Sequence, residues 1–300
     1  MSSLPWLQPA LQQFYQQQQA GRLAHALLLP LTVGDGGVVL AEQYVAAALC
    51  EQRNACGMCR SCKLLQAGNH PDVHWLKADG NQIKVEQVRE LCQSLTATAQ
   101  QGGYRVAVIE QSERMNTAAA NALLKTLEEP GKNTLLILQT DISSSLLPTI
   151  TSRCQRVAVS SPSTAQVQQW LAPQTLSDDI LAWALPTLGG ALALRDALQS
   201  DRFAALAKLK DDIEHSFISG HVDPQLADIK EDSIFDALSL SYRVLLQQMR
   251  VGGKDAFVMN AIAALAERIM RDSQQLRRMP TVNYLALMQS YVLDYNRLKN

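Results

Sequence analysis

A short apolar run, a glycine-rich turn and an apolar helix follow one another in the segment His25–Cys50. The run Ala26–Leu29 has the character of a buried strand, and Val38–Cys50 carries apolar residues at helical spacing. The turn between them contains the three glycines Gly34, Gly36 and Gly37. A strand, a glycine-rich loop and a helix in this order are typical of a phosphate-binding loop, where N–H groups at a helix N-terminus hold phosphate oxygens.

The residues that would perform phosphate chemistry are absent from this loop. A functional loop has the pattern GxxxxGK[ST], in which the lysine contacts the β- and γ-phosphates and the hydroxyl holds Mg²⁺. Here Leu31 stands at the first glycine, Gly37 at the lysine and Val38 at the hydroxyl. On these residues alone, the segment is either a degenerate phosphate loop or an ordinary glycine-rich turn between a strand and a helix.

Four of the six cysteines lie within thirteen residues, in the pattern C-x5-C-x2-C-x2-C: Cys50, Cys56, Cys59 and Cys62. The chain starts with MSSLPWLQP, which lacks the basic and apolar regions of a secretory signal, so we interpret the cluster as a metal site rather than as disulfides. Four thiolates suit a structural zinc ion and leave no open position for catalysis. An iron–sulfur cluster is the alternative, although no later cysteine followed by proline completes its usual pattern. Four unrelated buried thiols are the simplest alternative.

Apolar strands alternate with helical segments up to about residue 160. The predicted strands after the first are Val73–Leu76, Tyr104–Glu110, Asn133–Gln139 and Arg156–Val159. Such alternation predicts a parallel α/β sheet. Beyond the SSPS segment the periodicity is helical, and it ends in three predicted helices, Ser233–Arg250, Lys254–Ser273 and Thr281–Leu298. A chain of 300 residues is expected to form about two or three domains.

The composition argues against two classes of function. The net charge is −1, so no broad basic surface is expected to bind nucleic acid without help from partners. No apolar run approaches the roughly 18 residues that suggest a membrane span. We therefore expect a cytoplasmic protein with no membrane partner.

Four segments in one order resemble the clamp-loader subunits of bacterial DNA polymerase III, a branch of the AAA+ family. They are HALLL with GDGG, the four cysteines, AAANALLKTLEEP and LLPTITSRC. The most specific parts are Asn121–Pro130, Ser152–Cys154 and the inserted cysteine cluster, and the resemblance covers essentially the whole chain. It implies a RecA-like α/β domain over 1–160 with a zinc-binding insertion at 50–62. A small helical lid at 161–208 and a helical collar at 209–300, which joins subunits into a ring, would follow.

The resemblance also implies what each site does. The chain matches the clamp-loader subunit that has lost its own ATP site, and we expect it neither to bind nor to hydrolyse ATP. The strand that should end in a pair of carboxylates ends in Glu110–Gln111, and Gly189 stands where active relatives place the sensor-two arginine. Arg153 occupies the position of an arginine finger, which in the active relatives enters the ATP site of the neighbouring subunit and stabilises charge at the γ-phosphate. From its spacing alone, Arg153 would be a surface salt-bridge residue.

The implied protein is a non-catalytic subunit of a DNA polymerase holoenzyme. It would complete a hetero-pentameric ring with gamma/tau and delta subunits that loads the sliding clamp onto primed DNA. The first alternative is an active gamma/tau-type ATPase, against which Gly37, Val38 and Gln111 argue. The second is a zinc-dependent nucleic-acid-binding module, against which the charge and the scarcity of aromatic residues near the cysteines argue.

Overall fold

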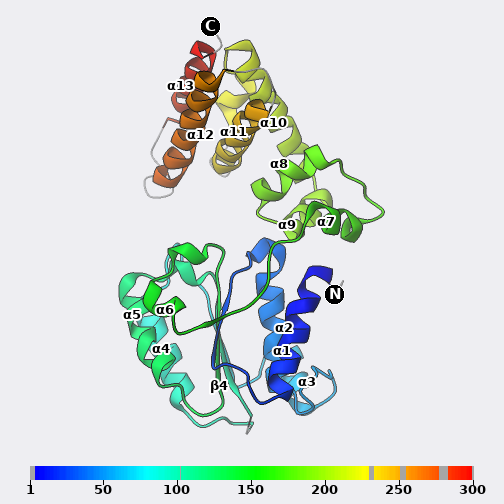
Figure 1. Cartoon of the computed structure of the whole chain (residues 1–300), viewed down its shortest axis with the longest axis vertical. Helices are drawn as coiled ribbons and strands as arrows, with labels where there is room; N and C mark the ends of the chain where they lie inside the picture. Colours follow the sequence, from blue (N-terminus) through cyan, green and yellow to red (C-terminus); the bar gives the residue numbers. More distant parts are fainter. Residues whose placement is uncertain (1–3, 102, 230–232, 251–254, 277–282, 299–300) are drawn as a thin grey trace. The chain divides into compact units, whose positions relative to one another are not determined.

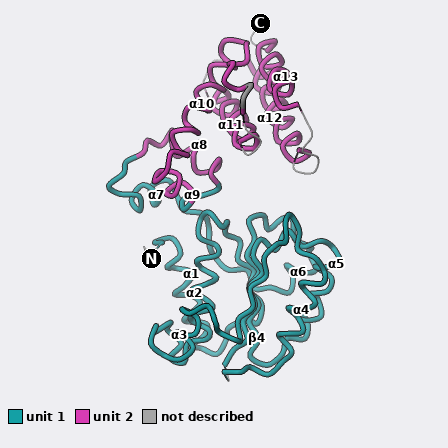
Figure 2. Tube along the Cα trace, turned by 180° about the vertical axis from the view of Figure 1, so that it is seen from behind, with its two compact units in different colours: residues 1–175, 189–192 teal, residues 176–188, 193–300 magenta. Residues whose placement is uncertain are grey.

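The computed structural model describes residues 4–101, 103–229, 233–250, 255–276 and 283–298. The chain divides into two units, which are coloured separately in Figure 2. The first comprises residues 1–175 with 189–192, and the second comprises 176–188 with 193–300. The division into three domains ending at 160, 208 and 300 stays a prediction.

A sheet of five parallel strands forms the centre of the first unit. Its strands are β1 (Ala26–Leu29), β2 (Val73–Leu76), β3 (Arg105–Ile109), β4 (Thr134–Gln139) and β5 (Gln155–Arg156), in the spatial order β2-β3-β4-β1-β5. In register, Leu28 of β1 lies beside Leu138 of β4 and Arg156 of β5. The predicted parallel α/β fold is confirmed.

Helices cover both faces of this sheet (Figure 1). On one side lie α1 (Gln8–Gln19), α2 (Gly37–Leu49) and α3 (Arg60–Gln66), and on the other lie α4 (Val85–Thr96), α5 (Thr117–Glu128) and α6 (Pro148–Thr151). Every residue of β3 and β4 is buried, as expected for strands covered on both faces. The unit also contains α7 (Thr164–Leu171) and the 3-10 helices Pro5–Leu7, Val33–Asp35, Ser112–Arg114 and Ser143–Ser145.

Local sequence signals explain where α5 begins and what it buries. Asn116 precedes the helix, and its side-chain oxygen accepts a hydrogen bond of 2.8 Å from the backbone N–H of Ala119. Leu123 and Leu127 lie one turn apart on the face that packs into the core beside α6. Pro130 follows closely, and a proline cannot continue a helix. Glu128 is therefore the last helical residue, directly after buried Leu127.

The second unit is helical. It contains α8 (Asp178–Leu188), most of α9 (Ala191–Leu198), α10 (Arg202–Ser219), the 3-10 helix Pro224–Asp228, α11 (Ile234–Arg250), α12 (Ala256–Leu276) and α13 (Tyr284–Arg297). The last three agree with the three predicted C-terminal helices, although the predicted first residues Lys254 and Thr281 lie outside the described part of the chain. Their buried residues recur at spacings of three and four, as in Tyr284, Met288, Tyr291 and Tyr295 of α13.

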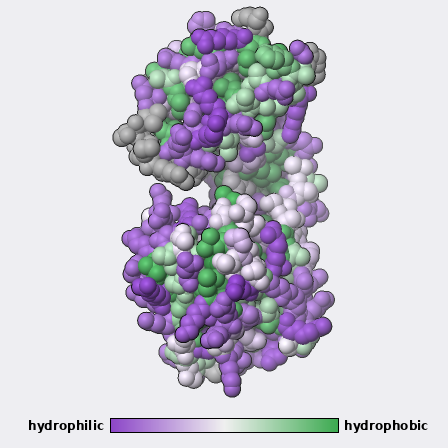
Figure 3. Space-filling view, turned by 60° about the vertical axis from the view of Figure 1, so that its left-hand side comes forward, coloured by the Kyte–Doolittle hydropathy of each residue, from purple (hydrophilic) through white to green (hydrophobic). Residues whose placement is uncertain are grey.

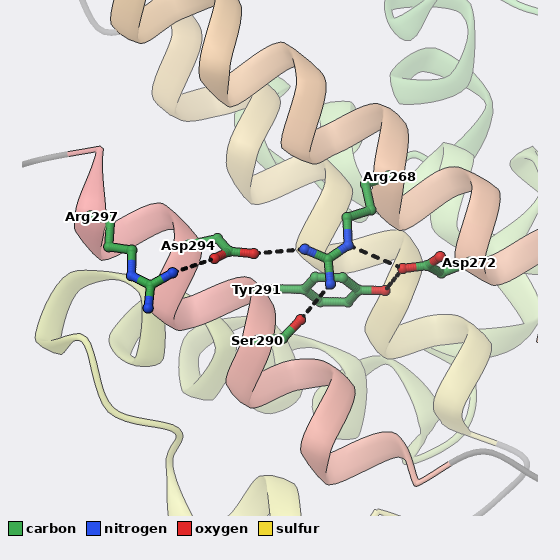
Figure 4. Close-up of polar contacts among 6 residues, drawn as sticks. All are labelled: Arg268, Asp272, Ser290, Tyr291, Asp294 and Arg297. Carbon is green, nitrogen blue, oxygen red and sulfur yellow. Dashed lines mark hydrogen bonds and ion pairs between the residues drawn. The ribbon is translucent and has the colours of Figure 1, made fainter.

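A polar network joins α12 to α13 (Figure 4). The guanidinium of Arg268 donates to Asp294 Oδ2 at 2.6 Å and to Ser290 Oγ at 2.7 Å. The hydroxyl of fully buried Tyr291 donates to Asp272 Oδ2 at 2.7 Å. Because the buried hydroxyl has a charged acceptor, it costs little to bury and fixes how the two helices pack.

None of the helices in the described residues is both long and apolar enough to cross a membrane. On the face drawn in Figure 3, apolar residues are interspersed with hydrophilic ones. Single exposed apolar side chains such as Met58 and Phe257 occur on the described surface, which is common in globular proteins.

Candidate functional site

The loop after β1 has the strand–loop–helix geometry that the sequence predicts. Residues Val33–Asp35 form a single 3-10 turn, and Thr32 caps it, since the Thr32 hydroxyl oxygen accepts a hydrogen bond of 3.1 Å from the Asp35 N–H. Gly36 has φ +96, a left-handed conformation that glycine adopts without strain, and α2 begins at the next residue.

The backbone of the loop leaves no room for a side chain at the lysine position. A Cβ atom on Gly37 would lie 2.1 Å from the carbonyl oxygen of Leu31, far inside van der Waals contact. The Gly37 N–H also donates a 2.8 Å hydrogen bond to the Thr32 carbonyl. The loop is therefore tightened onto itself at the position where a phosphate-binding loop carries its lysine.

A second glycine turn packs directly on this loop. A Cβ on Gly34 would lie 2.1 Å from the carbonyl oxygen of Gly189, and a Cβ on Gly190 would lie 2.4 Å from the carbonyl carbon of Gly34. The carboxylate of buried Asp35 accepts a 3.0 Å hydrogen bond from the Ala191 N–H, the first residue of α9. Because residues 34 and 190 are glycines, the backbone of the Gly189–Gly190 turn can pack directly on the loop and cover it.

An internal carboxylate, Asp141, binds three donors near this loop. Asp141 Oδ1 accepts from the Val33 N–H at 3.0 Å and from the Gln139 side-chain amide at 2.8 Å. Asp141 Oδ2 accepts from the Gln111 side-chain amide at 3.1 Å. The loop N–H of Val33 and the amide at the predicted acid position therefore already bond to a negative group. Sequence reasoning did not single out Asp141, although a polar residue just after a buried strand is a signal for it.

The two residues that follow β3 have partners of their own. Glu110 forms an ion pair of 3.0 Å with Lys77. Gln111 has φ +46, and its backbone N–H donates to Gln139 Oε1 at 2.7 Å. The Gln111 side chain is an amide, and unlike a carboxylate it cannot accept a proton from water as a general base must.

Arg153 lies on the surface, two residues after α6 ends. Its guanidinium forms a 2.7 Å ion pair with Glu128 and donates a 2.9 Å hydrogen bond to the Thr149 carbonyl. The side chain keeps 36% of its surface exposed, and the guanidinium carries more N–H donors than these contacts use. The arginine is thus both oriented by its own chain and open to an external acceptor.

The four cysteines come together as a group of potential metal ligands. The Sγ atoms of Cys50, Cys56, Cys59 and Cys62 all lie within 4.8 Å of one another. Four thiolates around zinc at about 2.3 Å would be about 3.8 Å apart, so the cluster needs only a small contraction to form a tetrahedron. Left-handed residues at Arg53, Ala55 and Gly57 turn the chain around the cluster.

Backbone N–H groups point at the sulfur atoms, as expected where thiolates are held. The N–H of Cys56 lies 3.4 Å from Cys50 Sγ, that of Cys59 lies 3.4 Å from Cys56 Sγ, and that of Cys62 lies 3.5 Å from Cys59 Sγ. Hydrogen bonds from N–H groups favour the ionised form of a thiol.

These surroundings affect the thiols differently. Burial disfavours the Cys50 thiolate, but backbone hydrogen bonds, that of Cys56 first, outweigh burial and lower the pKa to about 6. Backbone hydrogen bonds, that of Cys62 first, also lower the pKa of Cys59. Burial raises the pKa of Cys62 to about 12. A divalent metal ion bound by the four sulfur atoms would stabilise their thiolate forms.

Comparison with known proteins gives consistent similarities. A family model described as "DNA polymerase III, delta subunit" matches residues 6–163. A protein of Haemophilus influenzae named "DNA polymerase III subunit delta'" is 40% identical over 200 residues, which are 65% of this chain and 61% of that relative. The match thus spans about three fifths of that relative's length. A protein of the same name from Yersinia pestis is 34% identical over 262 residues, which are 83% of this chain and 77% of that relative.

A solved structure shares the fold. It is a DNA polymerase III gamma subunit-related protein from Thermotoga maritima, with a TM-score of 0.52 and 17% sequence identity, and the match covers 96% of this chain and 99% of that one. At this identity the likeness concerns the fold alone.

Proposed function

The chain belongs to the DNA polymerase III delta' family, and from this premise we propose that it is the non-hydrolysing subunit of a clamp loader. It would complete an ATPase ring with gamma/tau and delta subunits, and the ring would open a sliding clamp and place it on primed DNA. The observation that carries the proposal is the closed phosphate loop, in which Gly37 has no space for a side chain and the Gly189–Gly190 turn packs on Gly34.

The loop supports the non-catalytic part of this proposal on two independent grounds. Without a lysine and a hydroxyl, phosphate charge stays uncompensated and Mg²⁺ loses a ligand. In addition, the donors that would meet an anion are used internally, because the Val33 N–H and the Gln111 amide both bond to Asp141. An active gamma/tau-type ATPase is the rival that these contacts disfavour.

Arg153 is the functional group that we assign to this subunit. It is exposed, and it lies at the SRC segment that resembles the arginine finger of active relatives. We infer that Arg153 enters the ATP site of the adjacent subunit, where a guanidinium stabilises the charge of the transferring phosphoryl group.

For the cysteine cluster we infer a structural zinc ion held by Cys50, Cys56, Cys59 and Cys62. The thiolate donor set and its spacing suit zinc, and a bound ion would cross-link the end of α2 to the start of α3. A zinc-dependent nucleic-acid-binding module is the second rival, and the net charge of −1 disfavours it.

Affinity purification of the tagged chain from an extract of its own bacterium tests the proposed assembly. We expect gamma/tau and delta clamp-loader subunits to be recovered with it in stable amounts. Recovery of nucleic acid without these subunits would favour the zinc-module rival and contradict the proposal.

Restoring the missing residues of the loop should not restore hydrolysis. In the Gly37→Lys, Val38→Thr double variant, we expect no ATP turnover above background, because Gln111 cannot act as a base and Leu31 stays at the first glycine. The lysine Cβ should also collide with the Leu31 carbonyl and lower the free energy of unfolding by about 1–3 kcal/mol. Phosphate release and thermal unfolding measure both effects.

Val38→Thr alone serves as the matched control for this experiment, because it leaves Gly37 in place. We expect it to unfold close to the wild-type temperature. Measurable hydrolysis by the wild-type chain or by the double variant would contradict the closed-loop account.

A further inference from the structure

The ion pair between Glu128 and Arg153 joins two segments that the sequence presents as separate motifs. Glu128 is the last residue of α5, and Arg153 follows α6, yet Arg153 Nη2 lies 2.7 Å from Glu128 Oε1. We propose that Glu128 is a positioning residue, whose carboxylate orients the Arg153 guanidinium toward a phosphate of the neighbouring subunit. This inference rests on the proposed role of Arg153 as an arginine finger.

The two partners are attached to rigid parts of the core. Leu127, directly before Glu128, keeps 2% of its surface exposed, and Ile150, three residues before Arg153, is fully buried. Both side chains belong to the same hydrophobic cluster, so the backbones at the two ends of the ion pair are fixed relative to each other. A contact between two fixed points restricts a long side chain far more than a contact between two loops would.

Both terminal nitrogens of the guanidinium are held at the same time. One terminal nitrogen binds Glu128, and the other donates to the Thr149 carbonyl at 2.9 Å. Because the guanidinium is planar and rigid, fixing two of its nitrogens also fixes the direction of the N–H groups that remain. A phosphate oxygen then meets a donor already in place, and little side-chain entropy is lost when the contact forms.

The ion pair is expected to contribute little to the free energy of folding. Half of the Glu128 side chain and 36% of the Arg153 side chain are exposed, and ion pairs of this kind contribute little to folding. What such an exposed pair can do is orient a side chain. Here that side chain is Arg153, the arginine to which the proposed function assigns a role.

The test compares variants in a loader reconstituted from the full-length chain and its partner subunits. The quantity to measure is the Arg153-dependent ATP turnover, which is the wild-type rate minus the rate of the Arg153→Ala loader. With Glu128→Gln, which keeps the size and removes the charge, we expect this quantity to fall roughly tenfold, since a misplaced group loses part of its effect. The KM for ATP should not change, because the nucleotide is held by the neighbouring subunit.

Glu129→Gln is the matched control, since Glu129 is the next residue and is also exposed. It should leave turnover, assembly and thermal unfolding unchanged. In the Arg153→Ala background, Glu128→Gln should cause no further loss, because a residue that acts through another has no effect once that residue is gone.

Each failure has a separate signature. Turnover unchanged or raised in the Glu128→Gln loader, with turnover lowered by Arg153→Ala, would overturn the positioning role and leave the proposed function intact. A further loss from Glu128→Gln in the Arg153→Ala background would overturn the positioning role as well. If Arg153→Ala itself has no effect on turnover, the finger role fails, and the role of Glu128 fails with it.

Discussion

A loader reconstituted with Arg153→Ala is expected to assemble normally and to lose most of its hydrolysis at one ATP site. Assembly should survive because the side chain is exposed and contributes nothing to the buried core. Arginine fingers are worth on the order of 10³ or more in rate in GTPase systems. Since only the site beside this subunit is affected, total ATP turnover should fall in part, and clamp loading, which needs the sites to act together, should fall further.

Two variants control for charge and position. Arg153→Lys should not restore activity, since an ammonium cannot reproduce the planar bidentate contact of a guanidinium. Arg156→Ala should have a much smaller effect, because Arg156 lies on β5 and donates a weak 3.4 Å hydrogen bond to Ser143 of its own chain. Clamp loading at the wild-type rate by Arg153→Ala, or equal damage from Arg156→Ala, would assign the finger role to another residue.

Removing the metal is expected to unfold the segment 50–62 locally. The purified chain should be colourless and carry about one zinc ion without iron, because four thiolates form a closed structural site. Cys56→Ser or Cys59→Ser should release the metal and raise hydrogen exchange over 50–62, since metal binding stabilises the fold of its own site. Acidification should also release zinc, because protons compete for the thiolates. Elemental analysis and hydrogen-exchange mass spectrometry measure these effects.

Cys92→Ser provides the control, since Cys92 lies outside the cluster, on α4, and packs against the core. It should keep the full metal content. A brown protein that contains iron and absorbs visible light would assign an iron–sulfur cluster to the site instead of zinc. A metal-free protein with normal protection over 50–62 would show that the cysteines are unrelated thiols.

The three inner strands β1, β3 and β4 could be predicted from the sequence because they are short, apolar and buried. The predicted limits of β1 and β2 agree with the structure, and β3 and β4 each begin one residue later than predicted. The last strand is shorter and shifted: it was predicted at Arg156–Val159 and covers Gln155–Arg156. β5 has only two residues, both exposed, so an apolar pattern does not define its limits.

The closed conformation of the loop after β1 could be predicted only in part. The missing lysine and hydroxyl are visible in the sequence, but the contact of Gly34 with Gly189 joins positions more than 150 residues apart in the chain. The role of Asp141 was missed for the same reason. Its three donors come from the loop, from the end of β3 and from β4, and only the folded sheet brings them to one carboxylate.

The Glu128 contact shows the same limit at the proposed finger. No local sequence pattern around Glu128 or Arg153 indicates that the two residues meet. The burial of Leu127 and Ile150 in one cluster brings them together. The packing of α5 against α6 therefore determines what Arg153 contacts.

Omitting and restoring this subunit tests the central claim most directly. ATP turnover and clamp loading on primed DNA should be measured for the isolated chain, for the partner subunits alone and for the complete mixture. We predict no turnover by the isolated chain, and a large gain in both activities when it joins the partners. ATP turnover by the isolated chain, or full clamp loading by the partners without it, would contradict the account.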